Sequence, residues 1–234
     1  MSRNLGTIRV GEQVGFDNVV KVWKRAGVGT PPIAVPSITL GVFELTPLEV
    51  ATAYTLFTNG GTVKPLKGLN YIQAGARKLR PEPAKDRSVA RPDTTFLVTS
   101  MMRSVINEGT GAAARGMGFT ADAAGKSGTT NDQRDAWFVG FTPELLTVVW
   151  VGFDDNTPIG LTGSQVALPI WTEFMKAAVA GRGTRQFEPP DGITFVEIDK
   201  DTGKLATPNC PRTFTESFIV GTEPLEICPL HASR

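Results

Sequence analysis

Long apolar runs and an excess of charge are both missing from this sequence of 234 residues. The longest nearly apolar stretch, residues 145–153, is far too short for a membrane-spanning helix, and the N-terminus has no basic segment followed by a hydrophobic one. The formal net charge is +1, and no cluster of lysine and arginine exceeds a few residues. We therefore expect no membrane anchor or export signal within this chain and no binding of nucleic acid.

Metal-binding side chains are also scarce, with one histidine, His231, and two cysteines, Cys210 and Cys228. One histidine cannot complete a four-ligand zinc set with two cysteines so spaced, so we expect no metal and no cofactor. Both cysteines lie near the C-terminus among prolines and polar residues, and we predict that they form a disulfide in an oxidising compartment. Two unrelated free thiols are the alternative, which the sequence leaves open.

Size and composition are those of a globular protein with a sizeable core. A chain of this length with 41% hydrophobic residues can form one large domain, or one domain with a small appendage. Turn residues become frequent after Pro189 and Pro190, and residues 193–198 and 214–220 have the pattern of strands. We therefore divide the chain into a main domain, residues 1–183, and a β-rich C-terminal appendage, residues 184–234.

The main domain has both helical and strand patterns. Apolar spacing predicts helices at residues 17–26, at 46–57, from Asp93 or Thr94 to the glycines that begin at 109, and at 169–180. Thr46 and Glu49 form a capping-box pattern at the start of the second helix. β-branched and aromatic runs at 136–141 and 146–153 flank a turn and predict a hairpin. The mixed, basic segment 62–90 suggests short strands or loops.

The most informative segment is Lys126-Ser127-Gly128-Thr129-Thr130, which combines a cation, hydroxyls and a glycine beside a strand-like run. That combination is typical of an anion-binding catalytic strand, and with the hairpin it gives three consecutive antiparallel strands. Side chains alternate along a strand, so the hydroxyls of Ser127 and Thr129 should point to one side as a carboxylate-binding pair. A second short motif, Ser2-Arg3-Asn4, stands at the start of the chain.

The third member of this motif set, Ser-x-x-Lys, is absent. None of the lysines has a serine or threonine three positions before it. The set Ser-x-x-Lys, Ser-x-Asn and Lys-Ser-Gly or its variants is that of penicillin-binding proteins and related β-lactamases. Because the nucleophile should lie in Ser-x-x-Lys, we expect that it lay upstream of Met1 and that this chain is the C-terminal part of a catalytic domain.

Longer segments extend the resemblance to class A penicillin-binding proteins over almost the whole chain. They are residues 37–61, 109–111, 126–156 and 221–224. The resemblance implies an α+β fold in which helices flank an antiparallel sheet, a partial serine β-lactamase-like transpeptidase fold. It also implies that two N-terminal strands and the helix bearing the nucleophile complete the sheet, so this chain alone should leave a sheet edge and an apolar face uncovered.

The same resemblance assigns roles to the motif residues. Ser2, Asn4 and Lys126 are implied as catalytic: Lys126 would place a charge beside Ser2, which helps to pass a proton to the leaving amine, and Asn4 would orient the substrate peptide. The segment from Ser127 through Gly128 and Thr129 to Thr130 is implied as substrate-binding. The backbone N–H of Thr129 would serve as an oxyanion donor, and Gly128 would avoid a collision with the nucleophile's helix.

The implied activity is that of a peptidoglycan D,D-transpeptidase acting through a serine acyl-enzyme. Alternatives are a D,D-carboxypeptidase or β-lactamase, which give the acyl group to water, and a non-catalytic truncated fragment. Implied partners are peptidoglycan stem peptides, β-lactams in the full-length parent, and the missing N-terminal half of the domain. Similar proteins are tethered by an N-terminal helix and act on the outer side of the cytoplasmic membrane, so the parent is expected there.

Three further interpretations compete with these assignments. The segment AGKSGTT could be a phosphate-binding P-loop, but that motif requires a glycine where Thr120 stands and a helix after the lysine. Residues 2–4 alone could be a polar helix start or a frayed terminus. Arg134 and Asp135 resemble a charged turn after the strand, where we expect a structural ion pair rather than catalysis.

Overall fold

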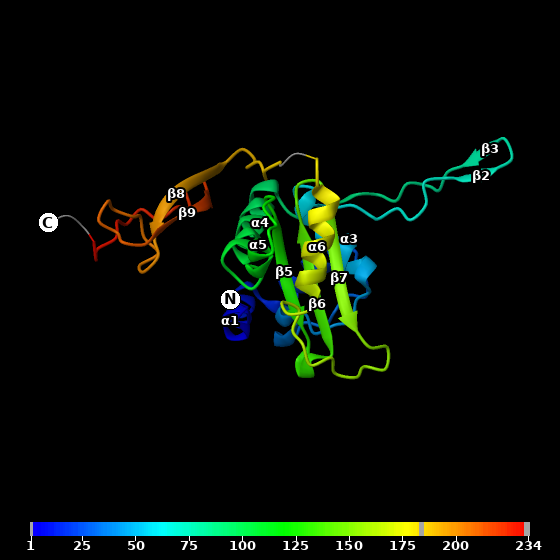
Figure 1. Cartoon of the computed structure of the whole chain (residues 1–234). Coiled ribbons are helices and arrows are strands. Elements are labelled where there is room, and N and C mark those ends of the chain that lie inside the picture. Colours follow the sequence, from blue (N-terminus) through cyan, green and yellow to red (C-terminus); the bar gives the residue numbers. More distant parts are fainter. Residues whose placement is uncertain (1, 183–184, 232–234) are drawn as a thin grey trace.

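The computed structural model describes residues 2–182 and 185–231 and has the predicted α+β fold (Figure 1). Its helices are α1 (Asn4–Val14), α2 (Phe16–Ala26), α3 (Pro47–Thr58), α4 (Pro92–Asn107), α5 (Ala113–Gly116) and α6 (Ala167–Val179), with 3-10 turns η1 (Pro36–Leu40) and η2 (Asn131–Gln133). Its strands are β1 (Thr62–Val63), β2 (Ile72–Ala74), β3 (Arg77–Leu79), β4 (Arg87–Ser88), β5 (Ala124–Thr129), β6 (Asp135–Phe141), β7 (Leu146–Gly152), β8 (Ile193–Asp199) and β9 (Thr213–Ile219).

The central sheet consists of three antiparallel strands in the order β5-β6-β7, as the sequence predicts. The predicted hairpin joins β6 to β7, with Phe141 opposite Leu146, and Lys126 of β5 lies opposite Val139 of β6. Helix α3 packs against one face of this sheet and α6 against the other, while α4 lies along β5 and contributes Met102 and Ile106 to the cores on the two faces (Figure 1). Among the described residues, β5 and β7 each have one edge that no other strand pairs.

Aromatic side chains fill the layers on both faces of the sheet. On the α6 face, the rings of Phe119 and Phe138 each lie 5.1 Å from the ring of Trp171, which is fully buried. The Trp171 indole N–H donates a hydrogen bond to the Gly140 carbonyl oxygen at 3.1 Å. A Cβ atom at Gly140 would lie 2.5 Å from the Trp171 ring, so a glycine is needed there for α6 to approach β6.

Two helix starts test the predicted capping signals. At α3 the capping box is confirmed: Thr46 Oγ1 accepts from the Glu49 N–H at 3.2 Å, and Glu49 Oε2 accepts from the Thr46 N–H at 2.8 Å. At α4 the predicted cap is wrong, because Arg91 is the N-cap and Asp93 already lies inside the first turn, where it pairs with Arg91. Pro92 explains the earlier start, since proline suits the first helical position.

Helix α1 was not predicted from the spacing of apolar residues. It precedes the first predicted helix and docks on η1, where Gly11 is buried and a Cβ atom would lie 2.3 Å from Thr39 Cγ2.

The short strands predicted for residues 62–90 are confirmed. Among them, β2 and β3 form an exposed hairpin that projects away from the body (Figure 1). No helix within the described ranges is both long and apolar enough to cross a membrane.

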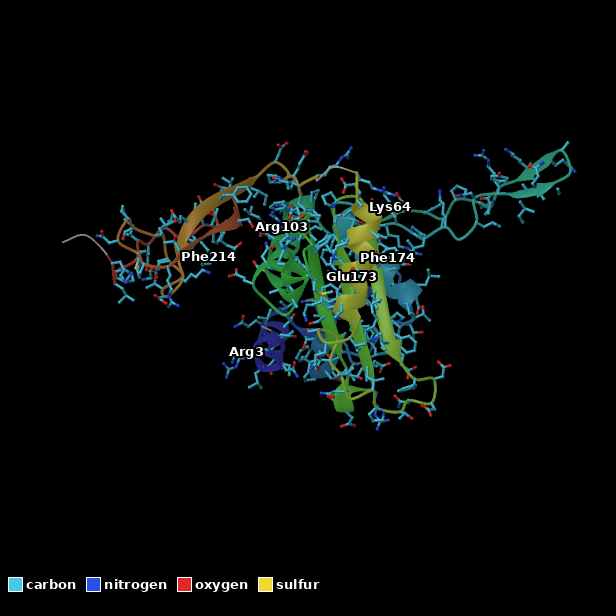
Figure 2. The ribbon with its side chains drawn as sticks, in the orientation of Figure 1. Arg3, Lys64, Arg103, Glu173, Phe174 and Phe214 are labelled. Atoms are coloured by element: carbon cyan, nitrogen blue, oxygen red, sulfur yellow. The ribbon has the colours of Figure 1, made fainter. Side chains whose placement is uncertain are left out.

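Residues 185–231, here called the C-terminal unit, contain the antiparallel pair β8 and β9, close to the predicted ranges. Phe96 of α4 contacts Phe195 of β8 at 6.3 Å between ring centroids, and Lys200 pairs with Glu108 at 3.3 Å. Figure 2 labels Phe214 in this unit and Arg103 on α4. The division expected between residues 183 and 184 lies outside the described residues.

Candidate functional site

Lys126 joins the two motifs that the sequence singled out. Its Nζ donates hydrogen bonds to Ser2 Oγ at 3.2 Å and to the Ser127 carbonyl oxygen at 2.8 Å. Lys126 is partly buried, and burial lowers the pKa of its ammonium group below the ordinary value because desolvation disfavours the charged form. The structure therefore places a desolvated cation against the Ser2 hydroxyl.

The Ser2-Arg3-Asn4 segment is a helix start, as one of the competing interpretations predicted. Asn4 is the first residue of α1 and is exposed to solvent, and Ser2 directly precedes this helix. The contact of Ser2 with Lys126 distinguishes this segment from an ordinary helix start. Helix α1 packs on η1, and the Ser2 hydroxyl is hydrogen-bonded to Lys126 of β5. These two contacts hold residues 2–4 beside the strand that carries the Lys-Ser-Gly motif.

Ser127 contacts a hydroxyl group that the sequence reasoning did not select. Its Oγ lies 3.0 Å from Thr110 Oγ1, which follows the end of α4. The only signal for Thr110 was its place in the Gly-Thr-Gly segment at 109–111, which resembles the same family. The two side chains form a hydroxyl pair beside Lys126, an arrangement that suits the donation of hydrogen bonds to a carboxylate.

Thr129 faces a different segment from Ser127. Its Oγ1 accepts a hydrogen bond from the Gly163 N–H at 3.0 Å. A Cβ atom at Gly163 would lie 2.4 Å from the Gly128 carbonyl oxygen and 2.3 Å from that of Trp137, so the backbone around residue 163 can approach β5 only with glycine there. At Gly128 itself, a Cβ atom would lie 3.1 Å from Trp137 Cβ.

The expected ion pair between Arg134 and Asp135 is wrong. Arg134 instead contacts Asp132, at 3.7 Å, and donates to the Asn156 carbonyl oxygen at 2.7 Å. The two Asp135 carboxylate oxygens accept from Thr130 Oγ1 at 3.2 Å and from Trp150 Nε1 at 2.9 Å. Asp135 thus stabilises the turn between β5 and β6, and the Thr130 hydroxyl takes part in that turn.

The P-loop alternative does not fit the structure. A P-loop requires a helix directly after its lysine and hydroxyl residue, with N–H groups that face the phosphates. Here Lys126 and Ser127 lie within β5, and the short turn η2 follows the strand. The Lys-Ser-Gly segment is therefore part of an antiparallel sheet edge.

A second group of polar side chains lies in the C-terminal unit. Asp199, Cys210, Cys228 and His231 each offer one ligand atom, and these four atoms lie within 4.8 Å of one another. Cys210 and Cys228 are free thiols in the structure and do not form the predicted disulfide. The sequence argument against a four-ligand set counted only cysteine and histidine and did not consider Asp199.

The fold is an antiparallel sheet between helices, and its Lys-Ser-Gly edge strand contacts the serine of the Ser-x-Asn motif. These two features together define the serine transpeptidase class, to which the motifs also point. Residues 1–176 match the model of the penicillin-binding protein transpeptidase domain, and residues 189–233 match that of the penicillin-binding protein 1A C-terminal domain. The chain belongs to the penicillin-binding protein transpeptidase family, and its C-terminal match is to the class A type.

Individual relatives cover nearly all of the chain. Penicillin-binding protein 1A of Aquifex aeolicus is 37% identical to this chain, in a match that covers 97% of this chain and 31% of the relative. Penicillin-binding protein 2D of Bacillus subtilis is 32% identical, in a match that covers 97% of this chain and 34% of the relative. The crystal structure of penicillin-binding protein 1A from Haemophilus influenzae has a TM-score of 0.85 at 28% identity and covers 97% of this chain and 40% of that one.

A more distant structure shares the fold. It is the PonA1 protein of Mycobacterium tuberculosis, solved in complex with penicillin V, with a TM-score of 0.59 at 24% identity over 74% of this chain and 51% of that one. The chain spans about a third of the length of the curated relatives named above.

Proposed function

We propose that this chain supplies the Lys-Ser-Gly strand and the Ser-x-Asn segment of a peptidoglycan D,D-transpeptidase active site. The contact between Lys126 and Ser2 carries the proposal, because it brings together two motifs that are 124 positions apart in the sequence. The family to which the chain belongs supports the reaction type, and the match of residues 189–233 supports the class A assignment.

The reaction is an acyl transfer from a stem peptide that ends in D-Ala-D-Ala. A serine hydroxyl attacks the carbonyl carbon of the penultimate residue, the C–N bond to the terminal D-Ala breaks, and that amine leaves with a proton. An acceptor amine then attacks the acyl-enzyme and releases the serine. The serine of Ser-x-x-Lys is absent from these 234 residues, so we infer that another part of the parent protein contributes the nucleophile.

Lys126 and Ser2 are proposed to act on the proton. The ammonium group stabilises a partial negative charge on Ser2 Oγ, which lets that hydroxyl relay a proton to the leaving amine. Its lowered pKa supports this role, because a proton is released more readily from a desolvated ammonium group. Asn4, at the start of α1, is proposed to orient the substrate peptide with its side-chain amide.

Ser127, Gly128, Thr129 and Thr130 are proposed to bind the substrate. The Ser127 hydroxyl, paired with Thr110, offers a hydrogen bond to the terminal carboxylate next to the Lys126 charge. Thr129 is proposed to contribute its hydroxyl and, through its backbone N–H, one oxyanion donor. The Thr130 hydroxyl already bonds Asp135, so its contribution is proposed to be the placement of the end of β5.

The whole parent protein is proposed to act outside the cytoplasmic membrane, on peptidoglycan stem peptides and with β-lactams as inhibitors. We also propose that the two parts of the chain divide at residues 183 and 184. The non-catalytic fragment remains a second candidate, supported directly by the missing Ser-x-x-Lys. A carboxypeptidase or β-lactamase would use the same motifs, and the C-terminal unit favours the transpeptidase over these two.

Labelling with a fluorescent penicillin tests the proposal. The full-length parent should form a covalent adduct that survives a denaturing gel, whereas this chain alone should remain unlabelled because it has no activated nucleophile. A label on the isolated chain would show that a residue within it, with Ser2 the first to examine, is the nucleophile. A parent that stays unlabelled while correctly folded would favour the non-catalytic fragment.

A further inference from the structure

The four-ligand cluster of Asp199, Cys210, Cys228 and His231 lies in the C-terminal unit, apart from Lys126 and Ser2. Asp199 ends β8, Cys210 lies in the loop before β9, and Cys228 and His231 follow β9. Asp199 and Cys228 have no solvent exposure, and Cys210 and His231 are half-buried. Polar side chains from segments that are distant in the sequence thus lie close together in the structure.

The distances between the ligand atoms are close to those of a tetrahedral metal site. His231 Nδ1 lies 3.2 Å from Asp199 Oδ2 and 3.3 Å from Cys228 Sγ, and all four ligand atoms lie within 4.8 Å of one another. Around Zn²⁺, with bonds of about 2.0–2.3 Å to nitrogen, oxygen and sulfur, neighbouring ligand atoms are separated by about 3.3–3.8 Å. The two distances from His231 Nδ1 are close to this range, and a zinc ion would fit once ligand atoms up to 4.8 Å apart move closer by at most about 1 Å.

One oxygen of Asp199 is held in place and the other is not. Oδ1 accepts hydrogen bonds from the Asp201 N–H at 3.0 Å, the Thr202 N–H at 2.9 Å and the Thr202 hydroxyl at 2.9 Å. Oδ2 is buried without a hydrogen-bond partner, although it lies near His231. A buried carboxylate oxygen without a partner is costly, and a cation at the centre of the cluster would supply the missing interaction.

The backbone around Cys210 also suits a metal-bound thiolate. The Thr207 N–H donates to Cys210 Sγ at 3.2 Å, and the Thr207 hydroxyl donates to the His231 carbonyl oxygen at 2.6 Å. Thr207 thus orients two members of the cluster, as the outer hydrogen-bond partners of metal ligands commonly do. Thr207 therefore connects the loop that carries Cys210 with the segment that carries His231.

The chemical types of the four side chains suit a divalent cation. One carboxylate and two thiols, which bind metals as thiolates, lie together with an imidazole, and a dication would neutralise the anionic ligands.

We propose that Asp199, Cys210, Cys228 and His231 bind one structural Zn²⁺ ion. Two thiolates, an imidazole and a carboxylate form a donor set that zinc accepts, and four protein ligands close the coordination sphere. The proposal is independent of the acyl-transfer function. It also gives the two cysteines a role that excludes a disulfide, because both sulfurs bind the metal.

The C-terminal unit is expected to require a source of stability beyond its own core, which a bound ion would supply. Its only sheet is the two-stranded pair β8 and β9, and among its described residues only Ile198 and Cys228 are buried apolar side chains. A two-stranded sheet with so small a core is marginally stable in water. Small domains of this size are commonly stabilised by a metal or by disulfides.

Zinc content of the full chain, purified with reductant and desalted, gives the direct test. We expect about one zinc per chain, and substitution with Co²⁺ should give the absorption of a tetrahedral thiolate site. Cys210→Ser and Asp199→Asn should each lower zinc affinity by at least about 100-fold. Thr202→Val, which removes one hydrogen bond to Asp199 and the acceptor of the Lys204 N–H but no ligand atom, should lower zinc affinity by about tenfold. Asp191→Asn, an exposed carboxylate before β8, is the control that should keep full zinc binding.

Thiol accessibility in the unsubstituted chain keeps the test independent of variants that fail to fold. With zinc bound, alkylation of Cys210 and Cys228 should be slow, and a strong chelator should make it fast. A reduced, folded chain that retains no zinc would overturn the proposal, as would ligand variants that bind zinc like the control. Thiols that react only after reduction would show the disulfide instead and would equally reject the zinc site.

Discussion

The Lys126 ammonium group lies 3.2 Å from the Ser2 hydroxyl, and the second hydrogen bond of Lys126 goes to the carbonyl of its own neighbour, Ser127. Both contacts are made by one side chain of an edge strand. A substitution at Lys126 therefore removes the proposed proton relay and the proposed anchor for the substrate carboxylate at the same time.

We expect Lys126→Ala in the full-length parent to slow acylation by β-lactams by about 10²-fold or more, because both of these interactions are lost. Ser127→Ala should have a smaller effect, since Thr110, Thr129 and the backbone remain. The second-order rate constant with a fluorescent penicillin measures both. Lys176→Ala, on the exposed side of α6, is the matched control; a wild-type rate for Lys126→Ala would reject the proposed role.

A second prediction concerns the protonation of Lys126. Because burial lowers its pKa in the folded state, the native protein loses this proton at a lower pH than the unfolded chain, which titrates near 10.5. Between the two pKa values the unfolded state binds more protons, so stability should rise with pH in that window through this residue. Denaturant unfolding of the parent at several alkaline pH values would measure the effect, and Lys126→Met should abolish that contribution.

The capping box of α3 predicts a stability change without any effect on the site. Thr46→Ala should destabilise the fold by about 1 kcal/mol, since it leaves the Glu49 N–H without its side-chain acceptor. Thr46→Ser keeps the hydroxyl and should restore most of the loss. Chemical denaturation of the two variants measures the difference, and equal stability of both would contradict the assigned cap.

A core substitution tests the packing of α6 on the sheet. Gly140→Ala places a methyl group against the Trp171 ring and should destabilise the fold by about 1–3 kcal/mol, because neither the strand nor the buried indole can move freely. Gly68→Ala has no heavy atom within 4 Å of the added carbon and should be nearly neutral. Thermal unfolding of the two variants under the same conditions makes the comparison.

The isolated chain should self-associate. Ile170 and Phe174 on α6 are 50% and 53% exposed, Phe153 beyond β7 is 57% exposed, and the outer edge of β7 is unpaired among the described residues. Figure 2 labels Phe174 on α6. Exposed apolar side chains next to a free strand edge promote association.

Glutamate substitutions can test whether this surface, and not another exposed apolar surface, causes the self-association. Ile170→Glu with Phe174→Glu should reduce self-association in analytical ultracentrifugation. Leu225→Glu, which changes an even more exposed leucine in the C-terminal unit, should not. Co-expression of the N-terminal half of the parent should have the same effect as the double substitution. A monodisperse monomer of the unsubstituted chain would argue against an uncovered face.

The sequence predicted those parts of the fold that local chemistry determines. The β6–β7 hairpin and the Thr46 cap follow from residues that are neighbours in the chain, and both are confirmed. The start of α4 was misjudged because Asp93 and Thr94 are good capping residues, while Pro92 at the first helical position places the cap at Arg91, two positions before Asp93. Where two local signals compete, the backbone restriction of proline decided the boundary.

Contacts between distant segments were less accessible to sequence reasoning. The pairing of Lys126 with Ser2 was anticipated only through the family motifs, since nothing in the spacing of the two residues indicates proximity. Thr110 beside Ser127 and Asp199 beside His231 were missed, because threonine and aspartate are common surface residues and only the tertiary fold gives them partners. Arg134 was paired with the wrong aspartate for the same reason.

Asp122 connects two parts of the molecule that the sequence treats as separate. One carboxylate oxygen pairs with Arg103 of α4 at 2.8 Å, and the other accepts the N–H of Phe187, in the segment that leads to β8, at 3.0 Å. Asp122 itself stands just before β5, the strand of Lys126. A mechanical load on the C-terminal unit would therefore reach the beginning of the lysine strand through the Asp122 carboxylate, in addition to the contacts of Phe195 with Phe96 and of Lys200 with Glu108.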